Sequence, residues 1–388
     1  MNTKKRKTYY ANFVLCAVFV CTLSTGSLSQ TIDIDRVAAE FEPEIRKTML
    51  EGSIPSVTVA LVSGENIIWK NAYGYSNIWA RTPAVTSTVY LIGSTFKAMS
   101  MYALLQQMEE GKFKLDDHVS SYLNEFYIQN EDPDNRITFR HLLTHTSGLP
   151  ADFGPHDVWG ETVPPSLKEY LGKSLRVSNP PLKRVVYSNM AYTLIGYLVE
   201  KFSGGPYKEY MQKNIFDVVG MKDTAFIPRR DMEERLAIPY VLDSGKQVPA
   251  VRYKANVWPA GIVYGTVIDQ ATWLITNLND GEFKGKRLLS LETVDEIMTR
   301  QYDQFAGPIS NGWLNETTGY GLTWWISERN GNTVFAHSGS VSGYTAFLAG
   351  DRDQKIGFAI LSNGNRAHPH LYYLAKKALE LMERYREQ

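Results

Sequence analysis

The stretch that decides the fold reads Leu91-Ile92-Gly93-Ser94-Thr95-Phe96-Lys97-Ala98-Met99, and it joins a strand-like run to a helix-like one. In residues 98–108, apolar side chains recur at the three-and-four spacing of a buried helical face. Ser94 therefore belongs to the first turn of the helix, and Lys97 follows on the same face. This spacing predicts that the lysine amine reaches the seryl hydroxyl.

A serine and a lysine at this spacing can form a nucleophile and its base. A hydroxyl is a poor nucleophile until its proton is removed, and a lysine whose pKa is lowered by burial can accept that proton. The start of a helix also offers free backbone N–H groups to a developing oxyanion. The alternative is that Ser94 caps the helix and Lys97 is a solvated charge. Chance alone produces about one or two such spacings in a chain of this length.

The first residues have the layout of a secretory signal peptide. Lys4-Lys5-Arg6-Lys7 is positively charged, residues 13–23 are apolar, and Ser27 and Ser29 precede a cleavage site at Gln30. The apolar run is short for a membrane span. We therefore expect cleavage after residue 29, export to the periplasm or the medium, and no stable membrane span afterwards.

The composition excludes several classes of protein. The 388 residues are 44% hydrophobic and 21% charged, which is ordinary for a globular protein with a large core. The two cysteines, Cys16 and Cys21, lie in the expected signal peptide, so the remaining chain forms no disulfide and holds no cysteine-ligated metal. Without its four basic residues the net charge is −4, and no basic patch indicates nucleic acid. We expect no cofactor.

Strand-like segments stand at both ends of the remaining chain, with helices between them. After an opening helix, residues 57–62 and 67–69 are typical of a hairpin. Further strands are expected near the other end, before a closing helix over 370–385. They are 320–326, 333–337, 344–349 and 356–361.

This order predicts an α+β fold. An antiparallel sheet of five or more strands is flanked by the N-terminal and C-terminal helices, and a mostly helical domain is inserted into it. The expected boundaries are 1–29 for the signal peptide, 30–115 and 255–388 for the discontinuous sheet domain, and 116–254 for the helical insertion.

Two histidines, His141 and His145, stand four residues apart on a short predicted helix and could ligate a metal. No acidic residue lies between them, and no third ligand is evident. We therefore interpret both as structural and predict no metal site.

Three short motifs follow one another along the chain: Ser94-Thr95-Phe96-Lys97, Tyr187-Ser188-Asn189 and His337-Ser338-Gly339. In this order they resemble the penicillin-recognising serine hydrolase superfamily, whose class A members carry Ser-x-x-Lys, Ser-Asp-Asn and Lys-Thr-Gly. The tyrosine of the second motif is similar to the class C β-lactamase branch, with its family VIII-type esterase and D-amino-acid peptidase relatives. Residues 141–149 and 259–261 also resemble that branch, so the likeness extends from about residue 37 to the C-terminus.

Tyr75-Ser76-Asn77 repeats the second motif. It precedes the serine, whereas the family places this motif after the serine, in the helical domain. We therefore choose Tyr187 and interpret Tyr75 as a turn residue.

The resemblance implies roles for individual residues. Ser94 attacks a carbonyl and is acylated, while Lys97 and Tyr187 share the transfer of its proton to the leaving group. A charged Lys97 could lower the pKa of Tyr187, or a neutral Lys97 could itself be the base. The implied substrate-binding residues are Asn189, His337, Ser338 and Gly339, and the implied oxyanion hole consists of the backbone N–H groups of Ser94 and Ser340.

His337 stands where β-lactamases usually carry a lysine, a permanent cation that holds a substrate carboxylate. A histidine of ordinary pKa, about 6.5, is mostly neutral at pH 7. This difference weakens the case for penicillins and cephalosporins, which carry a carboxylate. Residues 262–265 are also bulkier than the small-residue run usual in relatives.

The leading hypothesis is therefore an exported serine hydrolase that cleaves small-molecule esters or amides, of carboxylesterase or D-amino-acid peptidase type. One alternative is a class C-like β-lactamase, and another is a non-catalytic penicillin-binding or sensor domain. A metal hydrolase is disfavoured because no ligand cluster is evident. The sequence does not indicate an oligomeric state.

Overall fold

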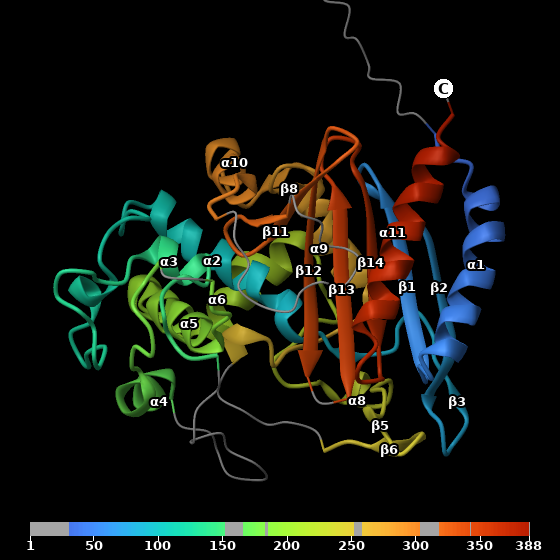
Figure 1. The fold of residues 1–388 in the computed structure, drawn as a ribbon, viewed down its shortest axis with the longest axis horizontal. Helices are drawn as coiled ribbons and strands as arrows, with labels where there is room; N and C mark the ends of the chain where they lie inside the picture. Colours follow the sequence, from blue (N-terminus) through green and yellow to red (C-terminus); the bar gives the residue numbers. More distant parts are fainter. Residues whose placement is uncertain are drawn as a thin grey trace, which may run out of the picture.

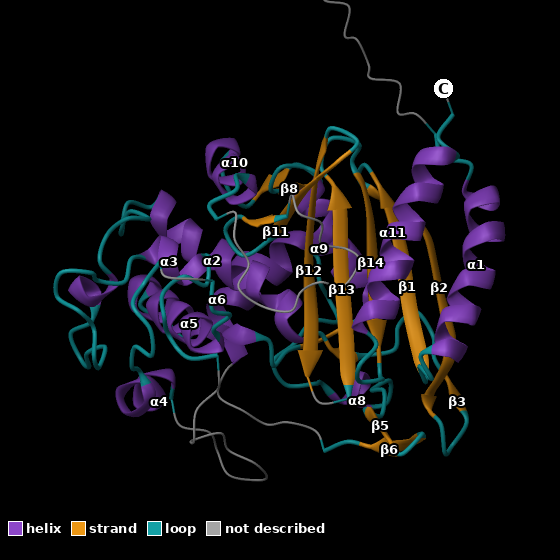
Figure 2. Cartoon of the chain, in the orientation of Figure 1, coloured by secondary structure: helices purple, strands orange, loops and turns teal. Residues whose placement is uncertain are grey.

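The computed structural model describes residues 31–151, 166–182, 185–251, 258–302, 318–341 and 343–387. The expected signal peptide lies outside these residues. Eight strands form one antiparallel sheet in the order β10-β11-β12-β13-β14-β1-β2-β3 (Figures 1 and 2). In that order they are Gly319–Tyr320, Trp325–Arg329, Asn332–Val341, Tyr344–Asp351, Ile356–Ser362, Ser56–Ser63, Asn66–Asn77 and Thr82–Pro83.

Three smaller strand pairs accompany the sheet. They are β4 (Tyr90–Leu91) with β7 (Tyr264–Gly265), β5 (Tyr240–Asp243) with β6 (Lys246–Pro249), and β8 (Glu282–Phe283) with β9 (Lys286–Arg287). The α-helices of the described residues are α1 (Ile34–Glu51), α2 (Lys97–Glu109), α3 (Phe139–Leu143), α4 (Leu167–Ser174), α5 (Asn189–Ser203), α6 (Tyr207–Met211), α7 (Asp217–Val219), α8 (Arg230–Glu233), α9 (Val267–Leu278), α10 (Leu291–Met298) and α11 (His368–Arg384).

Helices cover the sheet on both faces, and further helices gather beside it (Figure 1). Helices α1 and α11 pack on one face, where Phe41, Phe358 and Leu374 are among the fully buried side chains. Helix α9 covers the other face and shares a second core with α2 and α5. Burial of these apolar side chains is the main stabilising term of such a layered fold.

The two ends of the described chain meet. The backbone N–H of Asp33 donates to Tyr385 O over 2.9 Å, and Glu387 N donates to Thr31 O over 2.9 Å. Strand β14 pairs with β1, so the first and last strands of the described residues lie side by side in the sheet. Among the described residues, no helix is long and apolar enough to cross a membrane.

The expected fold class is confirmed, because one large antiparallel sheet combines strands from both parts of the chain and is flanked by helices. The proposed domain boundaries stay predictions. The expectation of a single strand over 320–326 is wrong. The backbone turns back at once, with Gly321 N donating to Trp324 O and Thr323 at φ +72°, so β10 and β11 form a tight hairpin.

Tyr75 is not a turn residue as expected. It lies within β2, which continues through a bulge to pair with β3, where Tyr75 is opposite Pro83. Its side chain is exposed.

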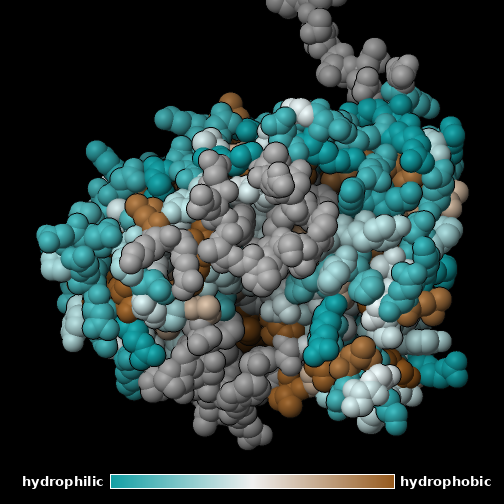
Figure 3. Space-filling model, in the orientation of Figure 1, coloured by the Kyte–Doolittle hydropathy of each residue, from teal (hydrophilic) through white to brown (hydrophobic). Residues whose placement is uncertain are grey.

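In Figure 3, hydrophobic residues gather on the lower part of the face drawn, where Figure 1 places β5 and β6. Val248 in β6 and Val251 after it are both exposed.

Candidate active site

Ser94 lies on a short 3-10 turn, Gly93–Phe96, that leads directly into α2. The preceding strand, β4, is held by a segment that comes much later in the sequence. It pairs with β7, and Ile92 N donates to Val263 O. The neighbouring Thr95 hydroxyl lies 2.9 Å from Ile92 O and 3.1 Å from Gln270 Oε1 of α9. The serine is therefore held at the junction of strand and helix that the sequence predicts.

Three glycines let the backbone pack tightly around this turn. Gly93 has a φ of +57°, and a Cβ there would lie 2.6 Å from Ser340 N. A Cβ on Gly339 would lie 2.1 Å from Ile92 O, and one on Gly261 would lie 2.9 Å from Ser94 N. Side chains at these positions would force the segments apart. The glycines thus keep β12 next to the N–H of Ser94, as the predicted oxyanion hole requires.

Lys97 is completely buried and has three polar contacts. Its Nζ lies 3.0 Å from Ser94 Oγ, 2.8 Å from Asn189 Oδ1 and 2.5 Å from the carbonyl of Ala260. Burial lowers the pKa of the amine well below its ordinary value, and no carboxylate of the described residues offsets this shift. The amine is therefore biased towards its neutral form.

A neutral amine has two N–H donors and one lone pair. The carbonyl oxygens of Ala260 and Asn189 can only accept hydrogen bonds, so they take the two donors. The lone pair then faces the Ser94 hydroxyl, which can donate its proton to it. This arrangement suits removal of a proton from the serine.

Tyr187 lies beside the other two predicted catalytic residues. Its ring centroid is 4.9 Å from Lys97 Nζ, and its hydroxyl lies near that of Ser94. Burial raises the pKa of its hydroxyl, while the nearby Ser94 hydroxyl lowers this pKa to a smaller extent. No partner in the described residues makes a hydrogen bond of ordinary geometry with the Tyr187 hydroxyl. Of the two possibilities left open by the sequence, the electrostatics therefore favour a neutral phenol and a neutral Lys97 over a phenolate.

Asn189 is the first residue of α5, and its side-chain amide is already engaged at both ends. Its Oδ1 accepts from Lys97, and its Nδ2 donates to the carbonyl of Ala151 over 2.9 Å. The preceding Ser188 caps the helix by accepting from Ala191 N. In this arrangement Asn189 holds the lysine, and its predicted contact with the substrate stays a prediction.

His337 lies where β12 loses one of its neighbours. Strand β11 pairs with β12 only as far as Ala336, so among the described strands the residues from His337 onward pair with β13 alone. The side chain is buried and its ring stacks on Trp325, with centroids 5.7 Å apart. Burial, and then the nearby Lys97, lower the pKa of His337 to about 3.

The neutral state of His337 has a defined hydrogen position. Its Nδ1 lies 2.6 Å from the carbonyl of Ser338, so Nδ1 carries the proton and donates it. Nε2 is then an acceptor, with no hydrogen-bond partner among the described residues. This histidine offers no positive charge to a substrate carboxylate.

Successive side chains of β12 point to opposite faces of the sheet. The other predicted residues of this strand, Ser338, Gly339 and Ser340, therefore have different surroundings. Gly339 abuts the turn that carries Ser94, whereas the Ser338 hydroxyl lies near Tyr372 of α11. Burial raises the pKa of that tyrosine, and the hydrogen bond with Ser338 opposes the rise. The predicted contact of Ser338 with a substrate stays a prediction. The side chain of Ser340 is exposed, while its backbone N lies next to Gly93.

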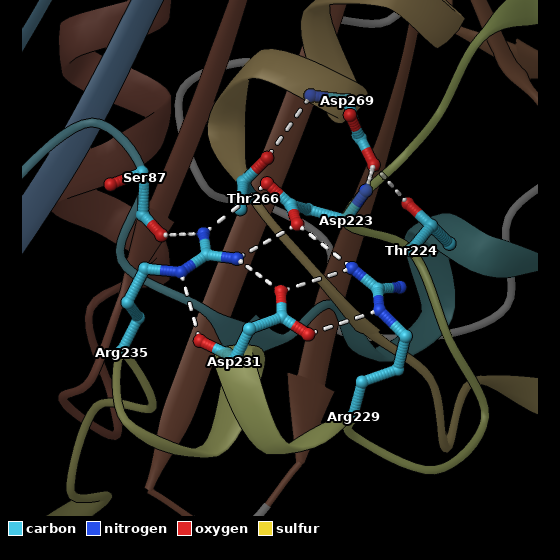
Figure 4. A network of polar contacts seen from close by, with 8 residues as sticks. All are labelled: Ser87, Asp223, Thr224, Arg229, Asp231, Arg235, Thr266 and Asp269. Atoms are coloured by element: carbon cyan, nitrogen blue, oxygen red, sulfur yellow. Dashed lines mark hydrogen bonds and ion pairs between the residues drawn. The ribbon is translucent and has the colours of Figure 1, made fainter.

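A network of charged residues supports the strand that precedes the serine (Figure 4). Arg235 donates to the carbonyl of Ser87 over 2.7 Å and lies 2.8 Å from Asp223 and 3.2 Å from Asp231. Arg229 contacts the same two carboxylates at 3.2 Å. Because Val89 N also donates to the carbonyl of Arg235, the network fixes the chain just before β4.

The network extends to α9 through Asp269, a buried carboxylate (Figure 4). Asp269 accepts from Asp223 N and from the Thr224 hydroxyl, both over 2.8 Å. Its own N–H donates to the Thr266 hydroxyl, which caps the helix. Burial raises the pKa of Asp269 to about 6, although these hydrogen bonds oppose the rise.

The two histidines of the predicted metal alternative have structural contacts. His141 Nδ1 accepts from Thr138 N over 3.2 Å and completes the cap of α3. His145 packs against Tyr187, a contact that the sequence did not reveal although the residue belongs to the stretch 141–149. Within the described residues, no group of three or more His, Cys, Asp or Glu side chains could hold a metal ion.

The chain as a whole is similar to known proteins. The family model described as Beta-lactamase matches residues 41–382. Protein flp of Staphylococcus aureus is 24% identical over 326 residues, covering 83% of this chain and 62% of that protein. Beta-lactamase-like protein 2 of Dictyostelium discoideum is 27% identical over 372 residues, covering 90% of this chain and 64% of that protein. The chain thus spans less than two thirds of the length of these curated relatives.

Among solved structures, the octameric penicillin-binding protein homologue from Pyrococcus abyssi superposes with a TM-score of 0.74 at 28% identity. The match covers 89% of this chain and 77% of the homologue. This chain therefore shares its fold with that homologue over most of its length.

Proposed function

The chain belongs to the β-lactamase family of serine hydrolases, and we propose that it hydrolyses small esters or amides through an acyl-enzyme on Ser94. The membership confirms the resemblance seen in the three motifs. The observation that carries the proposal is the buried Lys97, whose two carbonyl partners leave its lone pair for the Ser94 hydroxyl.

In the acylation step, Lys97 takes the proton of Ser94 as the oxygen attacks the substrate carbonyl carbon. The oxyanion is stabilised by the N–H groups of Ser94 and Ser340, each worth about 3–4 kcal/mol. Tyr187, a phenol of raised pKa, gives its proton to the leaving oxygen or nitrogen and regains one from Lys97. In deacylation, water attacks the ester, its proton passes to the same groups, and the acid departs as Ser94 is restored.

The charge of the site supports an uncharged substrate. Among the described residues, Lys97 is the one ionisable side chain that influences the pKa of His337, and burial biases both groups towards neutrality. A substrate carboxylate would therefore meet no permanent cation at either residue. Carboxylesterase activity on small acyl esters is the leading version of this proposal, and D-amino-acid peptidase activity is the second.

The test is the Ser94→Ala variant, measured by turnover of p-nitrophenyl acetate and by labelling with a fluorophosphonate. We expect both to be lost, because Ser94 is the nucleophile of the proposed mechanism. Ser120→Ala is the matched control, since Ser120 lies in the turn Val119–Tyr122, and it should keep both. Retention of turnover and labelling by Ser94→Ala would contradict the proposal.

A class C-like β-lactamase is the second candidate, and the family membership favours it. Nitrocefin turnover of about 10–1,000 per second, typical of dedicated enzymes, would establish this activity instead. Introducing a cation with His337→Lys should strengthen binding of anionic β-lactams if the neutral histidine is what disfavours them. Weaker binding by that variant would contradict this explanation.

A binding or sensor role is distinguished from hydrolysis by the fate of the acyl group. Intact-mass measurement after exposure to esters, D-amino-acid amides and β-lactams should find an adduct on Ser94 that forms and then disappears. An adduct that persists with no product released would indicate a sensor.

We also propose that the chain is exported after removal of its first 29 residues, on the basis of the pattern in residues 4–29. The N-terminal sequence of the protein recovered from a producing cell should begin near Gln30. Recovery of the intact N-terminus from the cytoplasm would contradict export.

A further inference from the structure

His145 holds the backbone on both sides of Tyr187. Its Nδ1 accepts from Ser188 N over 3.0 Å, and its carbonyl oxygen accepts from Val186 N over 2.8 Å. One residue of the loop after α3 thus binds the residues before and after the tyrosine. These two hydrogen bonds fix the backbone position from which the Tyr187 side chain extends.

The imidazole of His145 also packs against the tyrosine ring. The two ring centroids lie 4.2 Å apart, with an angle of 31° between the planes. Lys97 Nζ lies 4.9 Å from the same tyrosine ring. The His145 ring is completely buried, so no solvent separates it from these neighbours.

We propose that His145 is a positioning residue for Tyr187, holding the phenol at Ser94 through two backbone hydrogen bonds and a ring contact. This inference rests on the proposed function, in which Tyr187 transfers a proton. His145 would then take part in the reaction, a role that neither helix capping nor metal binding would give it.

The backbone of His145 supports this role. Its φ is +56°, a left-handed conformation that is uncommon for residues other than glycine, although histidine is among the more tolerant. Such conformations are energetically unfavourable and persist where surrounding contacts impose them. Here the contacts are those to the residues on either side of Tyr187.

The positioning requires a neutral histidine. Because Nδ1 accepts from Ser188 N, the ring proton must be on Nε2, and protonation of Nδ1 would break this bond. Burial, followed by Lys97 and His337, lowers the pKa of His145 well below its ordinary value. Among the described residues, the other rings beside His145 are those of Tyr187, Tyr192 and Tyr320, and none of these residues is a carboxylate that would favour the charged form.

The test is the His145→Asn variant, because asparagine tolerates a positive φ and keeps an acceptor for Ser188 N but lacks the ring. We expect the turnover number for p-nitrophenyl acetate to fall about 10- to 100-fold, the scale of a misplaced reacting group, with little change in KM. The matched control is His141→Asn, which alters a histidine that caps α3. It should lower the melting temperature and leave turnover unchanged.

A double-mutant cycle with Tyr187→Phe separates positioning from a general loss of structure. The Phe variant keeps the ring and removes only the hydroxyl, so adding His145→Asn to it should cause no further loss of turnover. Losses that multiply would overturn the proposal, as would full turnover in His145→Asn. If wild-type protein neither turns over esters nor labels with a fluorophosphonate, the proposed function fails instead.

A second measurement needs no activity. In protein labelled with ¹⁵N-histidine, we expect His145 to keep an unprotonated Nδ1 and a protonated Nε2 from pH 8 to pH 5. The His145→Asn variant assigns its signals. Titration of His145 within that range, or the opposite tautomer, would overturn the proposal whatever the reaction of the protein.

Discussion

Lys97 and Arg235 are both cationic residue types near the strand and turn that carry Ser94, yet their surroundings are opposite. Lys97 is fully buried, and its polar partners are two carbonyl oxygens and a hydroxyl. Arg235 is partly exposed and contacts two carboxylates, Asp223 and Asp231 (Figure 4). Burial lowers the pKa of the lysine, whereas the hydrogen bond with Asp223 raises the pKa of the arginine.

The difference indicates how the same fold makes one basic side chain reactive and gives the other a structural role. An amine without a carboxylate partner stays reactive, because its neutral form has a lone pair. A guanidinium surrounded by carboxylates is permanently charged and serves as a structural tie. We expect replacement of Lys97 to cost activity and replacement of Arg235 to cost stability.

The largest expected effect comes from Lys97→Met, which removes the base. Turnover of p-nitrophenyl acetate should fall about 10²- to 10⁴-fold. The free energy of unfolding should stay the same or rise by about 0.5–2 kcal/mol, since a desolvated amine is replaced by an apolar side chain of similar length. Chemical denaturation measures the second quantity. A loss of stability together with activity would remove the contrast with Arg235.

Arg235→Met should lower the free energy of unfolding by about 2–3 kcal/mol, because bonds to two carboxylates and to the Ser87 carbonyl are lost. Turnover per folded molecule should change little. The matched control is Arg230→Met, an exposed arginine of α8, which should shift stability by no more than about 0.5 kcal/mol. If Arg235→Met folds stably but loses turnover, the arginine acts on the chemistry and the contrast is wrong.

Asp269 should make the same network sensitive to pH. Its pKa is raised from 3.8 to about 6 in the folded state, so the folded state binds this proton more tightly than the unfolded state. This contribution to stability is fully present below about pH 4 and is lost as the pH rises through 6. Asp269→Asn should therefore gain stability relative to the wild type between pH 4 and pH 7, by up to about 2 kcal/mol. A pH-independent difference between the two proteins would contradict the raised pKa.

The activity should show the opposite pH dependence. The neutral amine of Lys97 is the active form, so acylation slows as the pH falls through the lowered pKa of this residue, by about tenfold per pH unit below it. Fluorophosphonate labelling rates between pH 5 and pH 9 measure this profile. A rate that rises towards acid pH would contradict a lysine base.

The sequence predicted the parts of the site that depend on spacing. Ser94 and Lys97 stand three residues apart at the start of a helix, and their contact follows from helical geometry alone. The order of the three motifs identified Tyr187 over Tyr75.

Features that depend on burial were not predictable in the same way. The sequence left open whether Lys97 or Tyr187 is the base, because only packing sets the direction of each pKa. The carbonyl of Ala260 is a backbone group without a side-chain signal, and the contact of His145 with Tyr187 joins segments about forty residues apart. The hairpin at Thr323 was missed because an apolar run concealed a residue of positive φ.

The measurement that tests the central claim most directly is the titration of Lys97 itself. In protein labelled with ¹³C at the lysine ε-carbon, the Lys97 signal is assigned by its absence from Lys97→Met. We predict that this amine loses its proton well below the pH at which the exposed lysines do. Titration of Lys97 together with the exposed lysines would contradict a neutral base at Ser94 and the mechanism built on it.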